Sequence, residues 1–495
     1  MKRVLLLACV LPLAAGCAVG PDFKPPPAPE ASGYTAHPLT DTVSTPVPNG
    51  EAQHFRNGAD IAGDWWHLFG SPALDELVRQ ALAANPSLPA AQASLRQAME
   101  AVAAQRGSYF PTVGAEFSAS RNLTPTGAIT PVSASGNPYY GLITPQLNVS
   151  FVPDVWGTNF RAVESAEAAA DAQRGALEAA WVTLTSNVVA GAIQEASLRG
   201  QIAATEDTIR VEEDLLGILR RQQGLGQTAG ADVAQQEAAL AQAQLVLPPL
   251  RKQLDVQRDA LTALAGRLPD KEIAQTFDLA ALKLPVDVPV SLPSVLISQR
   301  PDVQQAEANL HVASANIGQA VAARLPQITL TAQLGNSANS VSQMFTPGTN
   351  FWTLGAGVTQ PLFEGFTLLH KERAARAAFD QAAAQYRSTV ITAMQNVADS
   401  LKALGHDADA VRSAAQADQA ASRSLGIARQ QLALGQVSYQ ALLTAQNASA
   451  QARLALVQAQ ATRLADTAAL FQALGGGWWH DSSLTAAAEG NTKGS

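Results

Sequence analysis

An internal duplication constrains this chain more than any other feature of its sequence. Residues of the first half recur in the same order in the second half, which is the mark of a repeated structural unit. The matches keep offsets between 208 and 215 residues and include Pro86 with Pro301, Pro111 with Pro326, Gly157 with Gly365, Gly226 with Gly435 and Gly266 with Gly475. We therefore expect tandem repeats over residues 73–270 and 301–478, joined by a linker at 271–300.

Each repeat has the same expected order of elements. A helix comes first, at 73–106 or 302–323, and a proline then ends it. A segment of strict apolar and polar alternation follows, which predicts a strand with one apolar face, and a second strand returns after a Gly/Pro/Ser/Asn-rich loop. The expected β-hairpins cover residues 111–155 and 326–363, and their strands have a length suited to crossing a bilayer at a tilt.

Long helical hairpins are predicted after each strand pair. Residues 159–221 and 367–431 read as unbroken helices of roughly 90 Å, far longer than a compact domain needs. Short turns near 224–230 and 435–438 send the chain back as a second helix. Val233, Leu240 and Leu247 recur every seven residues there, which indicates coiled-coil packing. Pro248 and Pro249 predict a break or kink in the first returning helix.

The amino terminus has the layout of an export signal. Lys2 and Arg3 precede an apolar stretch over residues 4–15, and small residues then lead to Cys17. This resembles a bacterial lipoprotein box, although Ala14 stands where leucine is usual; an ordinary signal peptide is the alternative. We expect residues 1–16 to be removed, Cys17 to carry lipid, and 17–72 to form an extended segment with an equatorial belt.

Composition excludes several classes of function. The 495 residues carry 33 Lys and Arg against 41 Asp and Glu, a net charge of -8, which argues against a nucleic-acid partner. The only cysteines are Cys9 and Cys17, so neither a disulfide framework nor a cysteine-based zinc site is expected. The chain has no uninterrupted run long enough for a spanning helix. No catalytic, phosphate-binding or metal-binding motif is present, and the carboxylates at 212–214 read as a solvated helix face.

The predicted strands require partners. Four strands per chain cannot close on themselves, and an open edge in lipid would leave backbone groups without hydrogen bonds. Two chains would supply eight strands and three would supply twelve; a barrel of about eight fills with side chains, whereas a larger one leaves a channel. A channel therefore favours a homotrimer, while loops of a soluble helical protein are the alternative reading of these segments.

Several short motifs resemble one family. They are the segments at 17–23, 65–66, 110–112, 154–157, 300–303 and 435–439, which read CAVGPDF, WW, FPT, DVWG, RPDV and GQVSY. Together they are similar to the TolC family of outer-membrane efflux ducts, in its lipoprotein (NodT-type) branch that serves tripartite RND pumps. The likeness covers nearly the whole chain from Cys17 to about Leu474.

The resemblance implies a mixed α+β membrane protein. It implies a trimeric 12-stranded β-barrel, with four strands per chain, continuous with a long periplasmic α-helical coiled-coil barrel. The duct would be passive, without enzymatic activity or cofactor, and would export small toxic compounds or drugs. Its implied partners are outer-membrane lipid, a periplasmic membrane-fusion adaptor and an inner-membrane proton-driven transporter.

The resemblance also implies a gate at the periplasmic helical tips. The expected tip residues are Gly224, Gly226, Gln227, Asp232, Gly435, Gln436, Ser438, Gln440 and Thr444. Family members commonly carry an acidic ring just after the second turn, where this chain has Ala441 and Thr444. We therefore expect a gate set by packing and neutral polar contacts, with Asp232 as its main local charge.

Four other functions stay open at this point. A type I protein-secretion duct or a metal-efflux duct would use the same fold. A periplasmic coiled-coil scaffold lipoprotein without a pore would need no strand pairs, and an enzyme would need a catalytic constellation that the sequence lacks. Residues 479–495 are expected to form a disordered tail.

Overall fold

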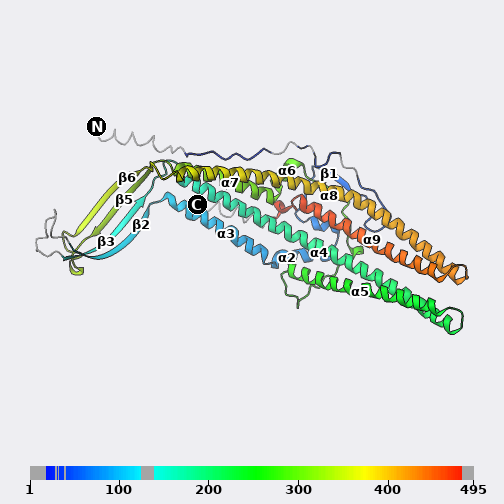
Figure 1. Cartoon of the computed structure of the whole chain (residues 1–495). Helices are drawn as coiled ribbons and strands as arrows, with labels where there is room; N and C mark the ends of the chain where they lie inside the picture. The colour runs from blue at the N-terminus through cyan, green and yellow to red at the C-terminus, as the bar shows by residue number, and fades with distance from the viewer. Residues whose placement is uncertain (1–17, 28–30, 32, 38–40, 124–138, 482–495) are drawn as a thin grey trace. The chain divides into compact units, whose positions relative to one another are not determined.

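The chain divides into two compact units. The structure, a computed structural model, describes residues 18–27, 31, 33–37, 41–123 and 139–481 (Figure 1). Unit 1 comprises residues 1–25, 95–172 and 306–386, and unit 2 comprises 26–94, 173–305 and 387–495. The predicted signal at 1–16, the predicted lipid-attachment residue Cys17, part of the first strand loop and residues 482–495 of the predicted tail lie outside the described residues. The start of that tail is ordered, contrary to expectation, because η6 (Trp478–His480) binds Asp60 through Trp479 and His480.

Unit 1 contains a four-stranded antiparallel sheet in the order β2-β3-β5-β6 (Figure 1). Its strands are β2 (Thr112–Leu123), β3 (Tyr139–Phe151), β5 (Gln327–Asn336) and β6 (Asn350–Thr359). Each repeat contributes one hairpin, and the pairing of β3 with β5 joins the two hairpins into one sheet. Strands β2 and β6 have their outer edges unpaired among the described residues.

The register keeps apolar residues of all four strands on one face. Val113 pairs with Val149, Leu147 pairs with Leu334, and the latter pairs with Trp352. Because side chains alternate between faces at every residue, one apolar pair in register places every second pair on the same side. The alternation expected from the sequence is therefore continuous across both repeats.

The tandem repeat is confirmed by matched helices. Helices α4 (Thr158–Gly224) and α8 (Thr367–Ala433) each have 67 residues, and α5 (Gly230–Leu264) and α9 (Tyr439–Ala473) each have 35. Each repeat also has a shorter helix before its hairpin, α3 (Ser87–Arg106) or α7 (Pro301–Ala322). A helix of 67 residues is about 100 Å long.

The single helix expected over 73–106 is wrong. The structure has α2 (Pro72–Ala84) and α3 (Ser87–Arg106), separated by an extended Asn85 and by Pro86. Proline disfavours helical backbone in the residue before it, so the helix ends there. The Asn85 side chain then bridges the break, because its Nδ2 donates to the Leu264 carbonyl at 2.9 Å and its Oδ1 accepts from the Ser87 amide.

Helix α5 continues through its two prolines, so of the break or kink expected there, the break is absent. It runs from Gly230 to Leu264 with Pro248 and Pro249 inside it. Both prolines are exposed, so backbone carbonyls that lose their helical donors there remain accessible to water. The missing hydrogen bonds are therefore tolerated without ending the helix.

A second, smaller sheet lies in unit 2 and was not expected. Strand β4 (Asp287–Val290), within the predicted linker, pairs in parallel with β1 (His54–Asn57). Helix α6 (Pro293–Gln299) follows directly. The linker is thus extended at its centre, as its prolines suggested, but it is held by backbone pairing to a segment more than 200 residues away.

The core of unit 2 holds the amino-terminal part of the chain against α9. The Trp65 ring stacks on Phe471 with centroids 5.0 Å apart, and both side chains are buried. Arg463 is fully buried, and its guanidinium donates to the carbonyls of Asn49 and Glu51 at 3.2 and 2.7 Å. A buried guanidinium needs acceptors for all its donors, so Arg463 fixes the path of residues 42–53.

One described helix, α4, contains a stretch long and apolar enough to cross a membrane by length and composition. Of that stretch, 67 % is buried within the protein. Burial of this extent is typical of a helix packed in a protein core.

Candidate functional site

The sheet of unit 1 presents an exposed apolar face. Val113 is 69 % exposed, Trp352 69 % and Leu354 73 %. Large apolar side chains at this exposure would be costly in water, and a contiguous set of them marks a contact with lipid or protein. The face is one strand length tall, and its strands have 10 to 13 residues. That length matches the 9–11 residues that a tilted strand needs to cross a bilayer.

The opposite face of the sheet is polar. Glu116 lies at its centre on β2 and accepts hydrogen bonds from Gln146 Nε2 and Asn148 Nδ2 on β3, each at 3.0 Å. Gln333 and Thr331 of β5 continue the same face, since they pair with Asn148 and Ser150. The sheet is therefore a wall with one face suited to lipid and one suited to water, the pattern of a transmembrane strand set.

The two helical hairpins of unit 2 end in turns of identical backbone form. Gly226 and Gly435 both have φ of 71°, the left-handed region that favours glycine. The amide after each glycine bonds back five residues, from Gln227 to the Gln222 carbonyl and from Gln436 to Gln431, both at 2.9 Å. This is a Schellman motif, which satisfies the last free carbonyls of α4 and α8.

The polar contacts at the first turn of the returning helix differ between the two tips. In the first tip, Thr228 Oγ1 donates to Asp232 Oδ2 at 3.1 Å, and Asp232 lies in the first turn of α5. In the second tip, Ser438 caps α9 by accepting from the Ala441 amide at 3.3 Å. An acidic side chain in a first helical turn is stabilised by the helix dipole, so Asp232 has a structural partner as well as a charge.

The structure brings the expected tip residues together in two groups. Gly224 is the last residue of α4, and it lies exposed with Gly226 and Gln227 at the first turn. Gly435 and Gln436 occupy the second turn, which ends at Ser438. Gln440 and Thr444 are exposed on α9, and Thr444 Oγ1 donates to the Gln440 carbonyl at 2.9 Å.

Just behind the turns, side chains from all four helices of the two hairpins pack into one apolar cluster. Its buried members are Leu216, Leu219, Val233, Ala428, Tyr439, Leu442, Leu443 and Ala445. A cavity of about 720 Å³ lies beside the cluster and is lined by residues of both hairpins, among them Asp232 and Gly435. Among the described residues, this cluster holds one tip against the other.

A buried polar contact accompanies this cluster, and sequence reasoning missed it. Glu212 on α4 is 3 % exposed, so the expectation of a solvated face over 212–214 is wrong for this residue; Glu213 and Asp214 are exposed. Gln236 on α5, fully buried, donates through Nε2 to the Glu212 carboxylate and to its carbonyl, the latter at 2.8 Å. The seven-residue spacing from Val233 indicated the packed face of α5, but nothing in the sequence pointed to Glu212.

Burial raises the pKa of the Glu212 carboxyl above its ordinary value, while the Gln236 hydrogen bond and the charge of Arg429 act to lower it. The buried Tyr439 phenol faces the same region, and burial likewise raises its pKa. An acid whose pKa is higher in the folded state adds stability when protonated and loses that contribution as the pH rises through the folded pKa. Ionisation of Glu212 therefore destabilises the packing of the helical tips.

Groups of three or more His, Cys, Asp or Glu side chains that could hold a metal ion are absent from the part of the chain that the structure describes.

Glu212→Gln is expected to stabilise the protein by an amount that grows with pH. The amide keeps the hydrogen bond from Gln236 but removes the ionisation that burial disfavours. The midpoint of thermal unfolding, measured from pH 4.5 to 7.5, should rise in the variant at the upper end and differ little from that of the parent at the lower end.

Glu213→Gln is the matched control, because it removes a neighbouring exposed carboxylate. Its effect should be small at every pH. A Glu212→Gln difference that stays constant across the pH range would contradict the burial argument.

Comparison with known proteins places the chain in context. The profile of the family described as "Outer membrane efflux protein" matches residues 77–267 and 292–476, which correspond to the two repeats. The antibiotic efflux pump outer membrane protein ArpC of Pseudomonas putida is 29 % identical over 489 residues, 97 % of this chain and 96 % of the relative. The pyoverdine export outer membrane protein OpmQ of Pseudomonas putida is 30 % identical over 453 residues, 90 % of this chain and 95 % of the relative.

The fold is shared with solved outer-membrane channels. The crystal structure of the Campylobacter jejuni CmeC outer membrane channel superposes with a TM-score of 0.85 at 22 % identity, covering 96 % of this chain and 98 % of that one. The paired repeats, the two-faced sheet and the profile match over both halves lead to one conclusion: the chain belongs to the outer membrane efflux protein family.

Proposed function

We propose that this protein is the outer-membrane channel of a tripartite efflux pump and that it exports small toxic organic compounds. The observation that carries the proposal is the sheet of unit 1, whose exposed apolar face and polar opposite face suit a wall between lipid and water. Family membership supports the same function. The channel is passive, and energy comes from an inner-membrane proton-driven transporter reached through a periplasmic adaptor.

Small organic substrates are favoured over the other cargoes of this fold. Two relatives that match 90 % or more of the chain are named for antibiotic efflux and for export of pyoverdine. Protein secretion and metal efflux remain the alternatives, and the pore-less scaffold is disfavoured because it has no use for the apolar sheet face.

The working assembly is a homotrimer. The sheet ends in the unpaired outer edges of β2 and β6, and backbone groups on these edges need partners inside a bilayer. Three copies would join edge to edge into a barrel of twelve strands. Twelve strands exceed the number at which side chains fill the interior, so a lumen remains for substrate.

The gate lies at the tips of the helical hairpins. The exposed tip residues Gly226, Gln227, Gly435 and Gln436 form the turns, and the apolar cluster behind them holds the two hairpins together. Separation of the hairpins would open the aperture. The exposed side of α9 at this end offers neutral Gln440 and Thr444, so packing rather than charge repulsion sets the closed state.

Channel formation is tested by planar-bilayer recording of the purified protein. The parent should produce discrete conductance steps. Leu354→Arg places a charge on the apolar face, at a cost of roughly 2–4 kcal/mol near the bilayer midplane, and should abolish or strongly reduce insertion. Thr353→Arg is the matched control on the polar face of the same strand, and it should insert and alter only the conductance.

Absence of steps in the parent would favour the scaffold over the channel. Equal insertion of the two arginine variants would contradict the assignment of the faces.

Thr444→Asp tests the neutral gate. Three carboxylates close to one axis should bind cations and raise cation selectivity, because opposite charges interact strongly where the dielectric constant is low. The selectivity ratio from reversal potentials in a salt gradient should increase. Thr462 is an exposed threonine farther along α9, so Thr462→Asp is the control and should leave the selectivity ratio near the parent value. An unchanged ratio in Thr444→Asp would show that Thr444 does not line the aperture.

Lipidation at Cys17 anchors the mature amino terminus in the outer membrane. Several acyl chains on one residue give a firm anchor, since each buried CH₂ contributes about 0.8 kcal/mol. Metabolic labelling with palmitate should mark the parent and should be lost in Cys17→Ala. Cys9→Ser is the control, because residue 9 lies in the predicted signal, and its labelling should persist; an unlabelled parent would indicate an ordinary signal peptide.

A further inference from the structure

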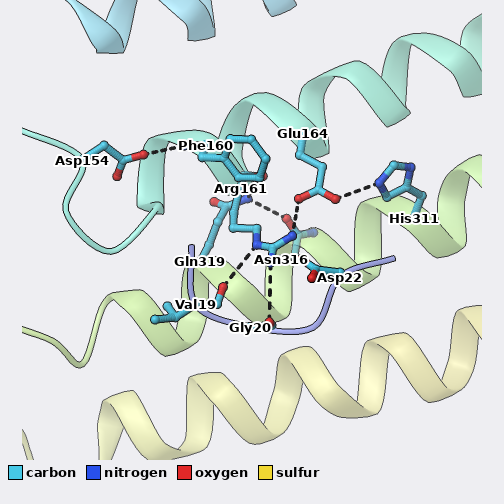
Figure 2. A network of polar contacts seen from close by, with 10 residues as sticks. All are labelled: Val19, Gly20, Asp22, Asp154, Phe160, Arg161, Glu164, His311, Asn316 and Gln319. Carbon is cyan, nitrogen blue, oxygen red and sulfur yellow. Dashed lines mark hydrogen bonds and ion pairs between the residues drawn. The ribbon is translucent and has the colours of Figure 1, made fainter. Parts of the chain in front are cut away.

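Residues 18–23, here called the N-terminal strap, lie in unit 1 against two helices of different repeats. The Val19 amide donates to the Trp156 carbonyl at 3.0 Å, just before α4 begins. Phe23 stacks on His311 of α7, with ring centroids 4.2 Å apart and planes 12° from parallel. Figure 2 shows the strap passing beneath the Arg161 side chain, which lies between it and the α4 backbone.

Arg161 holds the strap through several donors. Its guanidinium donates to the carbonyls of Val19 at 3.1 Å and Gly20 at 3.5 Å, and to Asp22 Oδ1 at 2.8 Å (Figure 2). A further donor reaches Glu164 Oε2 at 2.8 Å, and the other oxygen of Glu164 contacts His311 Nε2 at 2.9 Å. The contacts thus link α4, α7 and the strap in one network.

The two partners of the ion pair between Arg161 and Asp22 differ strongly in burial. Its side chain is 1 % exposed, whereas the Asp22 side chain is 88 % exposed. The strap contacts the guanidinium directly, so it contributes to this burial and also supplies three of the acceptors. A buried cation needs such acceptors to offset its lost hydration, so the hydrogen bonds stabilise the docked strap.

Three glycines let the strap approach its seat closely: Gly20 in the strap itself, Gly157 just before α4 and Gly318 on α7. A Cβ atom at Gly20, whose φ is 98°, would lie 2.4 Å from the Gly318 Cα atom, and one at Gly318 would lie 2.9 Å from the Val19 carbonyl oxygen. A Cβ atom at Gly157 would lie 2.6 Å from the Ala18 Cα atom. The backbones approach so closely that only glycine fits, and this complementarity is independent of the charges.

We propose that the N-terminal strap is a built-in tie that fastens the two repeats together by binding α4 and α7, with Arg161 as its positioning residue. The tie goes beyond channel function, because it acts on the packing of α4 against α7. With the strap docked, Ala18 contacts Gly157. If only Phe23 stayed bound, the five residues from Ala18 to Phe23 would let Ala18 move by about 17 Å.

The test uses the full chain with a nitroxide spin label on Lys24→Cys. Lys24 is exposed and directly follows the strap, so the label reports its mobility. The parent protein, treated with the same spin-label reagent, shows whether Cys17 reacts with it. The spectrum should show a restricted component in the Lys24→Cys protein and should lose it when Arg161→Ala is added.

Arg376→Ala is the matched control, since Arg376 is an exposed arginine of the same unit whose carboxylate partner is Glu372. It should leave the restricted component unchanged. Gly20→Ala changes only the strap side of the seat and should also release the label, whereas Gly33→Ala, with no atom within 4 Å of the added methyl group, should not. Gly20→Ala keeps the test decisive if Arg161→Ala does not fold.

The thermal midpoint provides a second measurement. It should fall in Arg161→Ala and Gly20→Ala and stay near the parent value in the two controls. A label that is already mobile in the Lys24→Cys protein, or that remains restricted in both Arg161→Ala and Gly20→Ala, would overturn the proposal. Neither readout depends on conductance, so the result stands apart from the channel test.

Discussion

The in-phase pairing of four strands is the constraint on which the rest of this structure depends. Leu147 on β3 meets Leu334 on β5, and that single register places the apolar residues of both repeats on one side of the sheet. A slip of β5 by one residue would turn Leu334 and Trp352 to the opposite face relative to Leu147 and leave Gln146 and Asn148 beside apolar neighbours. The two-faced wall therefore requires agreement between hairpins that are far apart in the sequence.

Much of the fold was predictable because its signals are local or repeated. The glycines at 226 and 435 marked both helical turns, and the alternation from Val113 and Ile328 marked both hairpins. The parallel pairing of β1 with β4 was not predictable, because each strand has only four residues, too few for an alternating pattern to identify a strand or its partner. The tertiary structure determines that β1 and β4 pair, and a local sequence pattern holds no information about it.

The candidate site shows the same division. The tip residues followed from the duplicated turns, whereas the buried Glu212 did not, because carboxylates usually mark a solvated face. Its burial depends on how α4 packs against α5, where the fully buried Gln236 supplies a donor. Arg161 was missed for a related reason: its acceptors lie about 140 residues away, in a segment that had been interpreted only as the start of the mature chain.

The equal lengths of the paired helices have a consequence for how such a chain can change. Helices α4 and α8 have 67 residues each, and α5 and α9 have 35 each, so the two turns meet in one apolar cluster. Adding one helical turn to a single hairpin would move its end by about 5.4 Å and take Leu219 and Val233 out of line with Tyr439 and Leu442. Insertions and deletions are therefore tolerated only in compensating sets, so the repeats must evolve in length together although they are free to diverge in sequence.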